Sequence, residues 1–357
     1  MLRIDQYVPC LSTADAVSGE VVHMRDLLRS WGYRSDIYTE LSSKRALHVS
    51  NHDSSDVLIY HLAVGSSLPY EWAVKGRVKI VRYHNITPSH FFQKGSMEEY
   101  VCDRARWQLS FVEAASDFIW CDSKLNQKDF LKHSSVFSVL RRYEDLESSH
   151  FIDRSHLKHI DFLTVGHCRP HKGHKDLMQL CALWKMCFKQ QIRMVWVGSW
   201  QMEDWSNELK QTANQLGLTL AESLSSEADI VYLQNITESE LSSVYEHAAV
   251  YLSMSTHEGV GLPLLEAARF GLPILAAECE GVRETLEGLS EAYLLPQTDM
   301  CLWVKMMKYC IDEKLVSQSR ILPERFQWDF LIQSFKKHID ESVFLFREIS
   351  TNSKSLT

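Results

Sequence analysis

Several features are missing from this sequence of 357 residues, and each absence excludes a class of protein. No apolar run is long enough to span a membrane, and the polar first residues do not resemble a signal peptide. A basic excess is also missing, since the formal net charge is -8, which argues against a nucleic-acid-binding protein. The nine cysteines are scattered, odd in number and without a Cys-x-x-Cys pair, which indicates reduced, buried thiols in a cytoplasmic protein.

Length and composition favour two globular domains. Apolar residues make up 45% of the chain and charged residues 24%, which is typical of a folded globular protein. A chain of this length suits two domains of ~150 to 180 residues. Residues 141–159 are charged, turn-rich and without clear periodicity, which predicts an interdomain linker. We therefore expect one domain over residues 1–150 and another over residues 155–324.

Short apolar runs alternate with stretches of helical spacing. Strands are predicted at 2–7, 36–39, 57–61, 79–83, 118–121, 161–165, 192–197, 230–233, 250–254 and 273–277. Helices are predicted at 20–31, 97–115, 123–132, 175–190, 205–216 and 237–247. This alternation, with strands that are apolar throughout, predicts an α/β fold built on parallel sheets.

The most informative stretch is residues 250–285, VYLSMSTHEGVGLPLLEAARFGLPILAAECEGVRET. It predicts a strand, a polar loop, a short helix closed by a glycine and a second strand. Two carboxylates, Glu258 and Glu266, bracket the loop and the first helical turns. Gly259 and Gly261 let the backbone approach a ligand closely, and Pro263 suits the first turn of a helix. Amide N–H groups and the helix dipole would then converge on one anion, most simply a phosphate.

The position of Glu266 has two interpretations. Side chains on a helix lean toward its N-terminus, so Glu266 would reach back toward the bound phosphate. A carboxylate in that position suggests hydrogen bonds to ribose hydroxyls. The alternative is that Glu266 is an exposed, solvated side chain on the surface.

The phrase Glu258-Gly-Val-Gly-Leu-Pro-Leu-Leu-Glu266-Ala-Ala closely resembles the Glu-x7-Glu signature of the retaining nucleotide-sugar glycosyltransferases of family 4. Members of that family have the GT-B fold, in which two Rossmann-like domains face each other across a cleft. The resemblance implies that Glu258 holds sugar hydroxyls and Glu266 the ribose. It also implies contact between the donor diphosphate and the loop residues Gly259, Val260, Gly261 and Leu262.

A second loop follows the predicted strand 161–165 and reads Gly166-His-Cys-Arg-Pro-His-Lys172. It is similar to the family's Gly-Arg-x-x-Pro-x-Lys loop, whose arginine and lysine hold the diphosphate. Here Gly166 and Lys172 are in place, but His167 stands where the arginine is expected. A neutral imidazole neutralises less charge and cannot form the bidentate fork of a guanidinium. Arg169 could substitute from two residues away, or the phosphates could hold His167 protonated. Otherwise the departure weakens donor binding and indicates a non-catalytic member of the family.

The same loop contains four residues of the types that bind zinc, namely His167, Cys168, His171 and His174. All four fall in one turn after a strand, whereas catalytic zinc sites usually draw their ligands from separated elements. We therefore predict no metal and no cofactor, and keep a zinc site as the alternative.

Polar residues follow the predicted strand 79–83, in the run Arg82-Tyr-His84-Asn-Ile-Thr-Pro88. Ligands bind at the carboxyl ends of parallel strands, and His61 ends the preceding strand. Because imidazole titrates near neutrality, His84 could bind a sugar hydroxyl or the leaving phosphate, or handle the acceptor's proton. A structural histidine in a turn is the alternative.

The resemblance implies two further donor contacts. Gly19 falls where family members place a loop that lines the cleft, and Ile236 falls where they seat the nucleobase. The alternatives are a tight turn at Gly19 and packing beneath a helix cap at Ile236. An apolar-striped helix predicted at 325–350 would cross back and complete the first domain, as it does in the resembled fold.

The function implied is transfer of a sugar, with retention, from a nucleotide diphosphate to a hydroxyl of a glycan or lipid-linked glycan. The pathway implied is assembly of a surface polysaccharide such as O-antigen, capsule or exopolysaccharide. Lys172 and the loop amides would stabilise the departing diphosphate without a metal. Peripheral contact with the inner face of a membrane is left open as a further partner. The alternatives are a sugar-nucleotide epimerase and a non-catalytic binding or regulatory protein, whereas a dehydrogenase is disfavoured because no Gly-x-Gly-x-x-Gly opens the chain.

Overall fold

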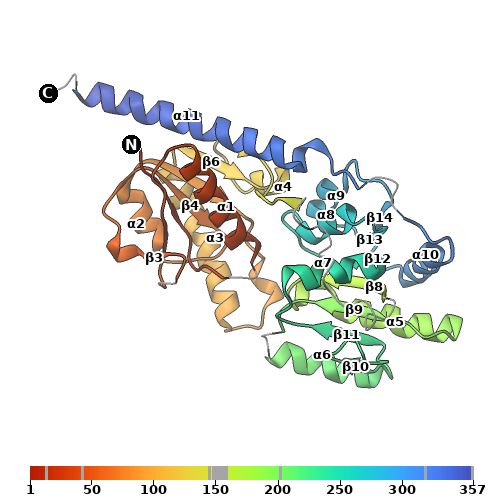
Figure 1. Cartoon of the computed structure of the whole chain (residues 1–357). Helices are drawn as coiled ribbons and strands as arrows, with labels where there is room; N and C mark the ends of the chain where they lie inside the picture. Colours follow the sequence, from red (N-terminus) through yellow and green to blue (C-terminus); the bar gives the residue numbers. More distant parts are fainter. Residues whose placement is uncertain are drawn as a thin grey trace. The chain divides into compact units, whose positions relative to one another are not determined.

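The computed structural model describes residues 1–12, 15–41, 44–143, 146, 160–200, 203–316 and 320–354. It divides into two compact units, of which unit 1 comprises Met1–Arg141 with Glu324–Thr357 and unit 2 comprises Arg142–Pro323. Each unit is built around one seven-stranded sheet (Figure 1). Most of the predicted linker, 141–159, lies outside the described residues.

The sheet of unit 1 has the strand order β3-β2-β1-β4-β5-β6-β7, with every neighbouring pair parallel among the described residues. Its strands are β1 Ile4–Tyr7, β2 Ile37–Thr39, β3 Leu47–His48, β4 Ser55–Leu62, β5 Gly76–Tyr83, β6 Phe118–Cys121 and β7 Ser135–Val136. Its helices are α1 Ala16–Ser30, α2 Leu68–Lys75, α3 Met97–Ala115, α4 Lys124–Gln127 and α11 Trp328–Lys354. Short 3-10 turns are η1 Val49–Asn51, η2 Ser89–Phe91 and η6 Glu324–Phe326.

Helix α1 begins earlier than its apolar spacing predicts. The Asp15 side chain accepts a hydrogen bond from the Ser18 backbone N–H at 3.0 Å, which caps the helix at Ala16. Gly19 therefore lies inside the first turns of α1, so the predicted helix start at Glu20 and the alternative of a tight turn at Gly19 are both wrong. A side chain at Gly19 would meet nothing within 4 Å.

The terminal helix α11 packs on the sheet of unit 1 with one apolar stripe. Leu331, Phe335 and Ile339 are fully buried there, in one cluster with Ile4 and Ile80 of the sheet. Their spacing of four residues places them on one face, so their burial anchors the helix. The helix begins at Trp328 because η6 occupies the preceding residues.

The sheet of unit 2 has the order β10-β11-β9-β8-β12-β13-β14, again with parallel neighbours throughout the described part. Its strands are β8 Ile160–Val165, β9 Met194–Val197, β10 Leu220–Ala221, β11 Ile230–Leu233, β12 Ala248–Ser253, β13 Ile274–Ala277 and β14 Ala292–Leu295. Its helical elements are η5 Pro170–Lys172, α5 His174–Phe188, α6 Glu203–Gln215, α7 Glu238–His247, α8 Leu262–Arg269, α9 Glu280–Leu286 and α10 Met300–Asp312.

The strand orders fix where a ligand site is expected. In each sheet the chain fills one side and then returns to fill the other, so the order reverses between β1 and β4 and between β8 and β12. Such switch points open a crevice at the carboxyl ends of the strands. The loops after β8 and β12 carry the two motifs of the second domain, and they leave the sheet side by side.

Several predictions of local structure need correction. The helix predicted at 123–132 is only the single turn α4, and the loop predicted at 280–284 is the helix α9. The nine cysteines form no disulfide, but Cys10, Cys187 and Cys301 are exposed, so the expectation of uniformly buried thiols is wrong. Among the described residues, no helix combines the length and apolarity needed to cross a membrane.

Candidate active site

A partly buried ion pair joins the two motif loops of unit 2. Lys172 ends the turn η5 after β8, and Glu258 lies in the loop after β12. The Lys172 Nζ lies 2.7 Å from the Glu258 Oε1, with the two side chains 20% and 13% exposed. The Thr256 backbone N–H also donates to the His171 carbonyl at 2.9 Å. The prediction that both loops build one site is thus matched by direct contact between them.

Glycine permits this close approach. Gly173 has a left-handed backbone (φ +70°), and a Cβ at that position would lie 2.3 Å from the Met254 carbonyl oxygen. Likewise, a Cβ at Gly198 would lie 2.0 Å from the Gly166 carbonyl oxygen. Any larger residue at Gly173 or Gly198 would force the loops apart, so these glycines set the spacing of the site.

The helix α8 begins beside the ion pair. Its N-cap is Gly261, which has a left-handed backbone (φ +72°) and no side chain to cap the first amides, and Pro263 lies in the first turn. A small pocket at this end is lined by Thr164, Val165, Gly166, Lys172, His174, Tyr251, Ser253, Ser255, Glu258, Gly261, Pro263 and Leu264. An ammonium group and a helix N-terminus thus share one pocket, which is the arrangement that binds an anion.

Glu266 is buried, with 5% of its surface exposed. The Tyr245 hydroxyl donates a hydrogen bond to its Oε2 at 2.8 Å. The alternative of a solvated surface glutamate is therefore wrong. Tyr245, at the end of α7, is a residue that the sequence motif did not reveal, and it fixes the orientation of this carboxylate.

The helix α9, which the sequence predicts as a loop without assigned chemistry, packs against the loop 258–261. The Thr285 hydroxyl donates to the carbonyl of Val260 and lies 3.0 Å from that of Gly281. A Cβ at Gly281 would lie 1.9 Å from the Glu258 carbonyl oxygen, so only glycine lets α9 approach. The signal that could have identified this support is the glycine itself, in the second position of a helix.

Several predicted donor residues of unit 2 do not line this pocket. His167 is exposed, Arg169 and Ile236 are half-buried, and Gly259 is half-buried in the loop between the ion pair and α8. Val260 and Leu262 are buried under the same loop.

The zinc-like residues do not form a cluster that could bind a metal. His174 is buried against the edge of the Trp196 ring, and His171 lies edge-on to His257. Burial, reinforced by the nearby Lys172, lowers the pKa of His171 to about 2 and that of His174 to about 4. Among the described residues, the ligand atoms of His, Cys, Asp and Glu converge closely enough for a metal only at Glu20, His61 and His84.

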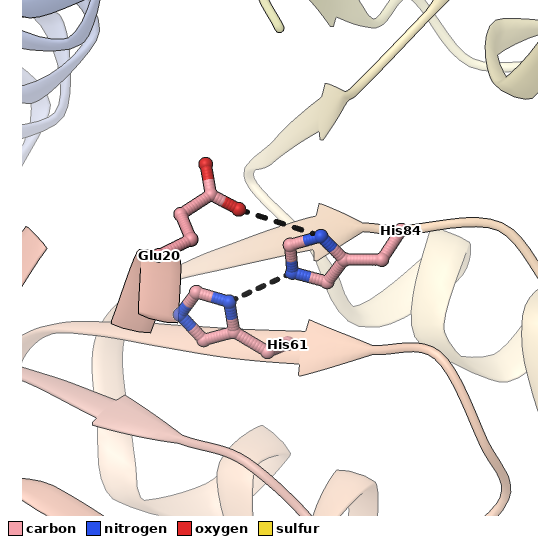
Figure 2. A group of neighbouring side chains, drawn as sticks. All are labelled: Glu20, His61 and His84. Carbon is pink, nitrogen blue, oxygen red and sulfur yellow. Dashed lines mark hydrogen bonds and ion pairs between the residues drawn. The ribbon is translucent and has the colours of Figure 1, made fainter. Parts of the chain in front are cut away.

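Figure 2 shows this second cluster, at the switch point of unit 1. The His84 Nε2 lies 2.9 Å from the His61 Nδ1, with the rings nearly parallel (8°) and their centroids 5.2 Å apart. The centroid separation equals the N–N distance plus one ring radius on either side. The two rings therefore meet edge to edge, and the hydrogen bond joins their facing nitrogens. The His84 Nδ1 is 3.0 Å from the Asp122 Oδ2 and 3.4 Å from the Glu20 Oε2.

The hydrogen bonds of His84 belong to a series that runs through His61 and Gln6 to the Val21 carbonyl. Because a carbonyl can only accept, it determines which atom donates in each bond of the series. The Gln6 amide N–H donates to the Val21 carbonyl at 3.1 Å, so the Gln6 Oε1 accepts from the His61 Nε2 at 2.9 Å. The His61 Nδ1 then has the lone pair and accepts from the His84 Nε2. Burial, with the charges of His84 and Arg82, lowers the pKa of His61 well below its ordinary value, so His61 keeps one proton.

The remaining nitrogen of His84 faces carboxylates and must donate as well. Arg82 lies 2.8 Å from Glu20 and 2.6 Å from Asp122, so both carboxylates are paired with a guanidinium that is fully buried. Arg82 and His84 thus both donate to the same buried pair of carboxylates. The two facing nitrogens of His61 and His84 are at hydrogen-bond distance, whereas two imidazoles on one tetrahedral Zn²⁺ would hold their nitrogens ~3.3 Å apart.

The comparisons with known proteins agree with this geometry. Residues 145–325, just over half of the chain, match the family of glycosyl transferases group 1, and the chain belongs to that family. An uncharacterized glycosyltransferase of Haemophilus influenzae is 27% identical over 188 residues, which are 50% of this chain and 49% of that protein. The serotype-specific mannosyltransferase WbdA of Escherichia coli is 28% identical over 124 residues, 34% of this chain and 14% of WbdA. The chain thus spans about half the length of the first of these relatives and less of the other.

One solved structure shows the same fold over nearly the whole chain. HepE of Anabaena, in complex with UDP and glucose, superimposes with a TM-score of 0.73 at 14% identity, covering 96% of this chain and 100% of HepE. Together with the two parallel seven-stranded sheets, this likeness confirms the predicted GT-B fold class.

Proposed function

We propose that this chain is a glycosyltransferase that moves a sugar from a nucleotide diphosphate to a hydroxyl acceptor with retention at the anomeric carbon. The observation that carries the proposal is the 2.7 Å pair of Lys172 and Glu258 beside the N-terminus of α8. A cation and a carboxylate at one switch point match the two needs of a sugar nucleotide, which has an anionic diphosphate and a hydroxylated sugar.

Donor binding exchanges the partners of this ion pair. The diphosphate binds to the Lys172 ammonium and to the amides at the start of α8. These donors stabilise the larger negative charge of a diphosphate more than the charge of one carboxylate, so the diphosphate displaces Glu258 from Lys172. Glu258 is then free to accept hydrogen bonds from sugar hydroxyls. As the glycosidic bond breaks, charge grows on the leaving phosphate, and the same fixed donors stabilise it. Glu266, oriented by Tyr245, is proposed to bind the ribose hydroxyls.

The remaining predicted residues have supporting roles in this proposal. Arg169 adds positive charge near the diphosphate, where His167 replaces the usual arginine. Gly259, Val260 and Leu262 shape the loop around it, and Ile236 contacts the base. His84 and Gly19 belong to unit 1, and His84 can bind a ligand only by giving up one of its two present partners.

The substrate class is proposed from the relatives. HepE is solved with UDP and glucose, which makes a uridine nucleotide the first donor to test. WbdA is a serotype-specific mannosyltransferase, which supports an acceptor that is a glycan or lipid-linked glycan of a surface polysaccharide. We place such a reaction in the cytoplasm, with peripheral contact to the membrane where the acceptor is lipid-linked. No metal is required by this mechanism, since Lys172 and the helix supply the positive field.

Calorimetry of the purified protein tests the donor site. UDP, GDP, ADP and their common sugars are titrated with and without Mg²⁺ or Zn²⁺, in the wild type, Lys172→Met and Glu266→Ala. Lys175→Met is a matched control, because Lys175 is three residues away and pairs with Glu208 outside the pocket. We expect one nucleotide to bind without metal and to lose affinity in both site variants but not in the control.

Two results would contradict the proposal. Binding of zinc without any nucleotide would assign the histidines a metal role instead. Binding of a nucleotide sugar followed by its epimerisation, or by no reaction with any acceptor, would favour the alternatives of an epimerase or a binding protein. The anomeric configuration of the product, measured by NMR, tests retention.

A further inference from the structure

Helix α3 displays a row of apolar side chains toward solvent. Met97, Tyr100, Trp107 and Phe111 recur, with Arg104 between them, at spacings of three and four residues. Tyr100 is 59% exposed, Trp107 88% and Phe111 38%. The face that packs on the core is a different one, formed by Cys102, Ala105, Gln108 and Val112. The row is therefore not part of the core, and its exposure has no role in holding unit 1 together.

A groove runs along this row. Tyr70 of α2, 54% exposed, packs against Phe111 with ring centroids 5.1 Å apart. Between the two helices lies a hollow of about 810 Å³, whose lining also includes Glu99 and Asp103. This volume is within the range of sites that bind small molecules or short chains of them.

Polar groups on the aromatic side chains of the groove are available to a ligand. Among the described residues, the hydroxyls of Tyr70 and Tyr100 and the indole N–H of Trp107 make no hydrogen bond. Gln108, by contrast, uses its amide internally, donating to the Ser66 carbonyl at 2.7 Å. Aromatic rings that carry an unused polar group bind partners that are apolar on one face and polar at the rim.

Charge selects among such partners. Helix α3 contains the acidic residues Glu98, Glu99, Asp103 and Glu113 and the basic residues Arg104 and Arg106. Anionic phospholipid surfaces attract helices with the opposite excess. A neutral sugar fits better, because a pyranose ring has C–H groups on its faces and hydroxyls around its rim, which suit aromatic faces and carboxylate or guanidinium groups respectively.

We infer that this groove, formed by Tyr70, Tyr100, Asp103, Arg104, Trp107 and Phe111, binds a neutral oligosaccharide. The inference rests on the proposed function and deepens it, because a transferase that extends a glycan gains acceptor affinity from a subsite that grips sugars already added. The groove lies wholly on α2, α3 and the turn before α3, so it is a separate site from the Lys172 pocket of unit 2.

Fluorine NMR of protein labelled with 5-fluorotryptophan tests this assignment. The chain has ten tryptophans, and the resonance of Trp107 is the one missing in Trp107→Phe. Neutral oligosaccharides of glucose, mannose, galactose or N-acetylglucosamine are added in turn. We expect at least one to shift the Trp107 resonance, and Trp107→Ala to weaken its binding about tenfold. Tyr100→Ala is a second variant of the same groove, and Phe344→Ala, exposed on α11, is the control that should keep full affinity.

The inference is overturned if no oligosaccharide moves the Trp107 resonance, or if Trp107→Ala binds as well as the wild type. It is also overturned if that resonance moves only with vesicles of phosphatidylethanolamine and one quarter phosphatidylglycerol, which would assign the groove to a membrane. The inference is likewise overturned if sedimentation shows a dimer that Trp107→Ala converts to a monomer. UDP calorimetry on the same variants separates the two proposals, because it reports on the Lys172 pocket, which shares no residue with the groove.

Discussion

The His84 Nε2 donates a hydrogen bond to the His61 Nδ1 at 2.9 Å, and this contact determines what His84 can do. The direction of the bond is set by Gln6, whose amide oxygen accepts a hydrogen bond from the only N–H group of His61. With its other nitrogen bonded to Asp122, His84 has no lone pair with which to accept the proton of an acceptor hydroxyl. To act as a base it would first have to give up one of these two contacts.

The protonation pattern is directly measurable by nitrogen-15 NMR of the histidine rings. From these hydrogen-bond partners we expect an N–H group on each nitrogen of His84 and one, on Nε2, on His61. Gln6→Leu removes the acceptor that selects this tautomer, so the His61 signal should change to a mixture of tautomers. Finding a bare Nε2 on His84 in the wild type would refute the assignment.

Glu258→Gln gives opposite effects on binding and on transfer. In the structure Glu258 competes with any anion for the Lys172 ammonium, so neutralising it should raise the affinity for free UDP. A partly exposed ion pair contributes on the order of 1 kcal/mol, so the gain should be about fivefold. Transfer should fall at the same time, since the amide holds sugar hydroxyls less strongly. Calorimetry with UDP and a product assay check the two effects, and a loss of UDP affinity would show that the pair does not exchange partners.

Tyr245→Phe removes the donor that satisfies the buried carboxylate of Glu266. A buried acceptor that loses a hydrogen bond costs about 1 to 3 kcal/mol of stability. We expect a loss in this range in urea unfolding, together with weaker nucleotide binding if Glu266 meets the ribose. Tyr309→Phe, at a hydroxyl that is exposed on α10, is the matched control and should change neither quantity.

The local elements of the site could be predicted because their residues are close in sequence. Gly261 and Pro263 mark the start of α8, and the positive φ of Gly271 ends it as expected. The contact between Lys172 and Glu258 could not be predicted, because it depends on β8 and β12 being neighbours in the sheet. Only the family resemblance linked the two loops beforehand.

Other parts were missed because a side chain's role depended on distant packing. Gly281 weakens the helical pattern of 280–286, yet α9 forms because the missing Cβ lets it pack on the Glu258 carbonyl. The polarity of the His61–His84 bond depends on Gln6, which lies beside His61 only through the register of β1 and β4. No motif spacing records these relationships.

The buried His174 makes the stability of unit 2 depend on pH. Burial first, and the charge of Lys172 second, lower its pKa from 6.5 to about 4. In the unfolded chain the ring keeps its ordinary pKa, so below pH 6.5 the unfolded state binds a proton that the folded state does not. The stabilising effect is therefore complete above pH 6.5 and is lost as the pH falls toward 4, by about 3 kcal/mol in all.

Urea unfolding at pH 7 and at pH 5 tests this linkage in the wild type and in His174→Leu. Between these pH values the protonation of unfolded His174 accounts for about 2 kcal/mol of lost stability, and the variant should lose that much less. The comparison isolates one group, because His171, whose pKa is lowered to about 2, contributes equally to both proteins. His90→Leu, at an exposed histidine, should keep the wild-type dependence. An unchanged pH dependence in His174→Leu would mean that His174 becomes protonated in the folded protein as readily as in the unfolded chain, so that the tight packing around it does not exclude the charged ring.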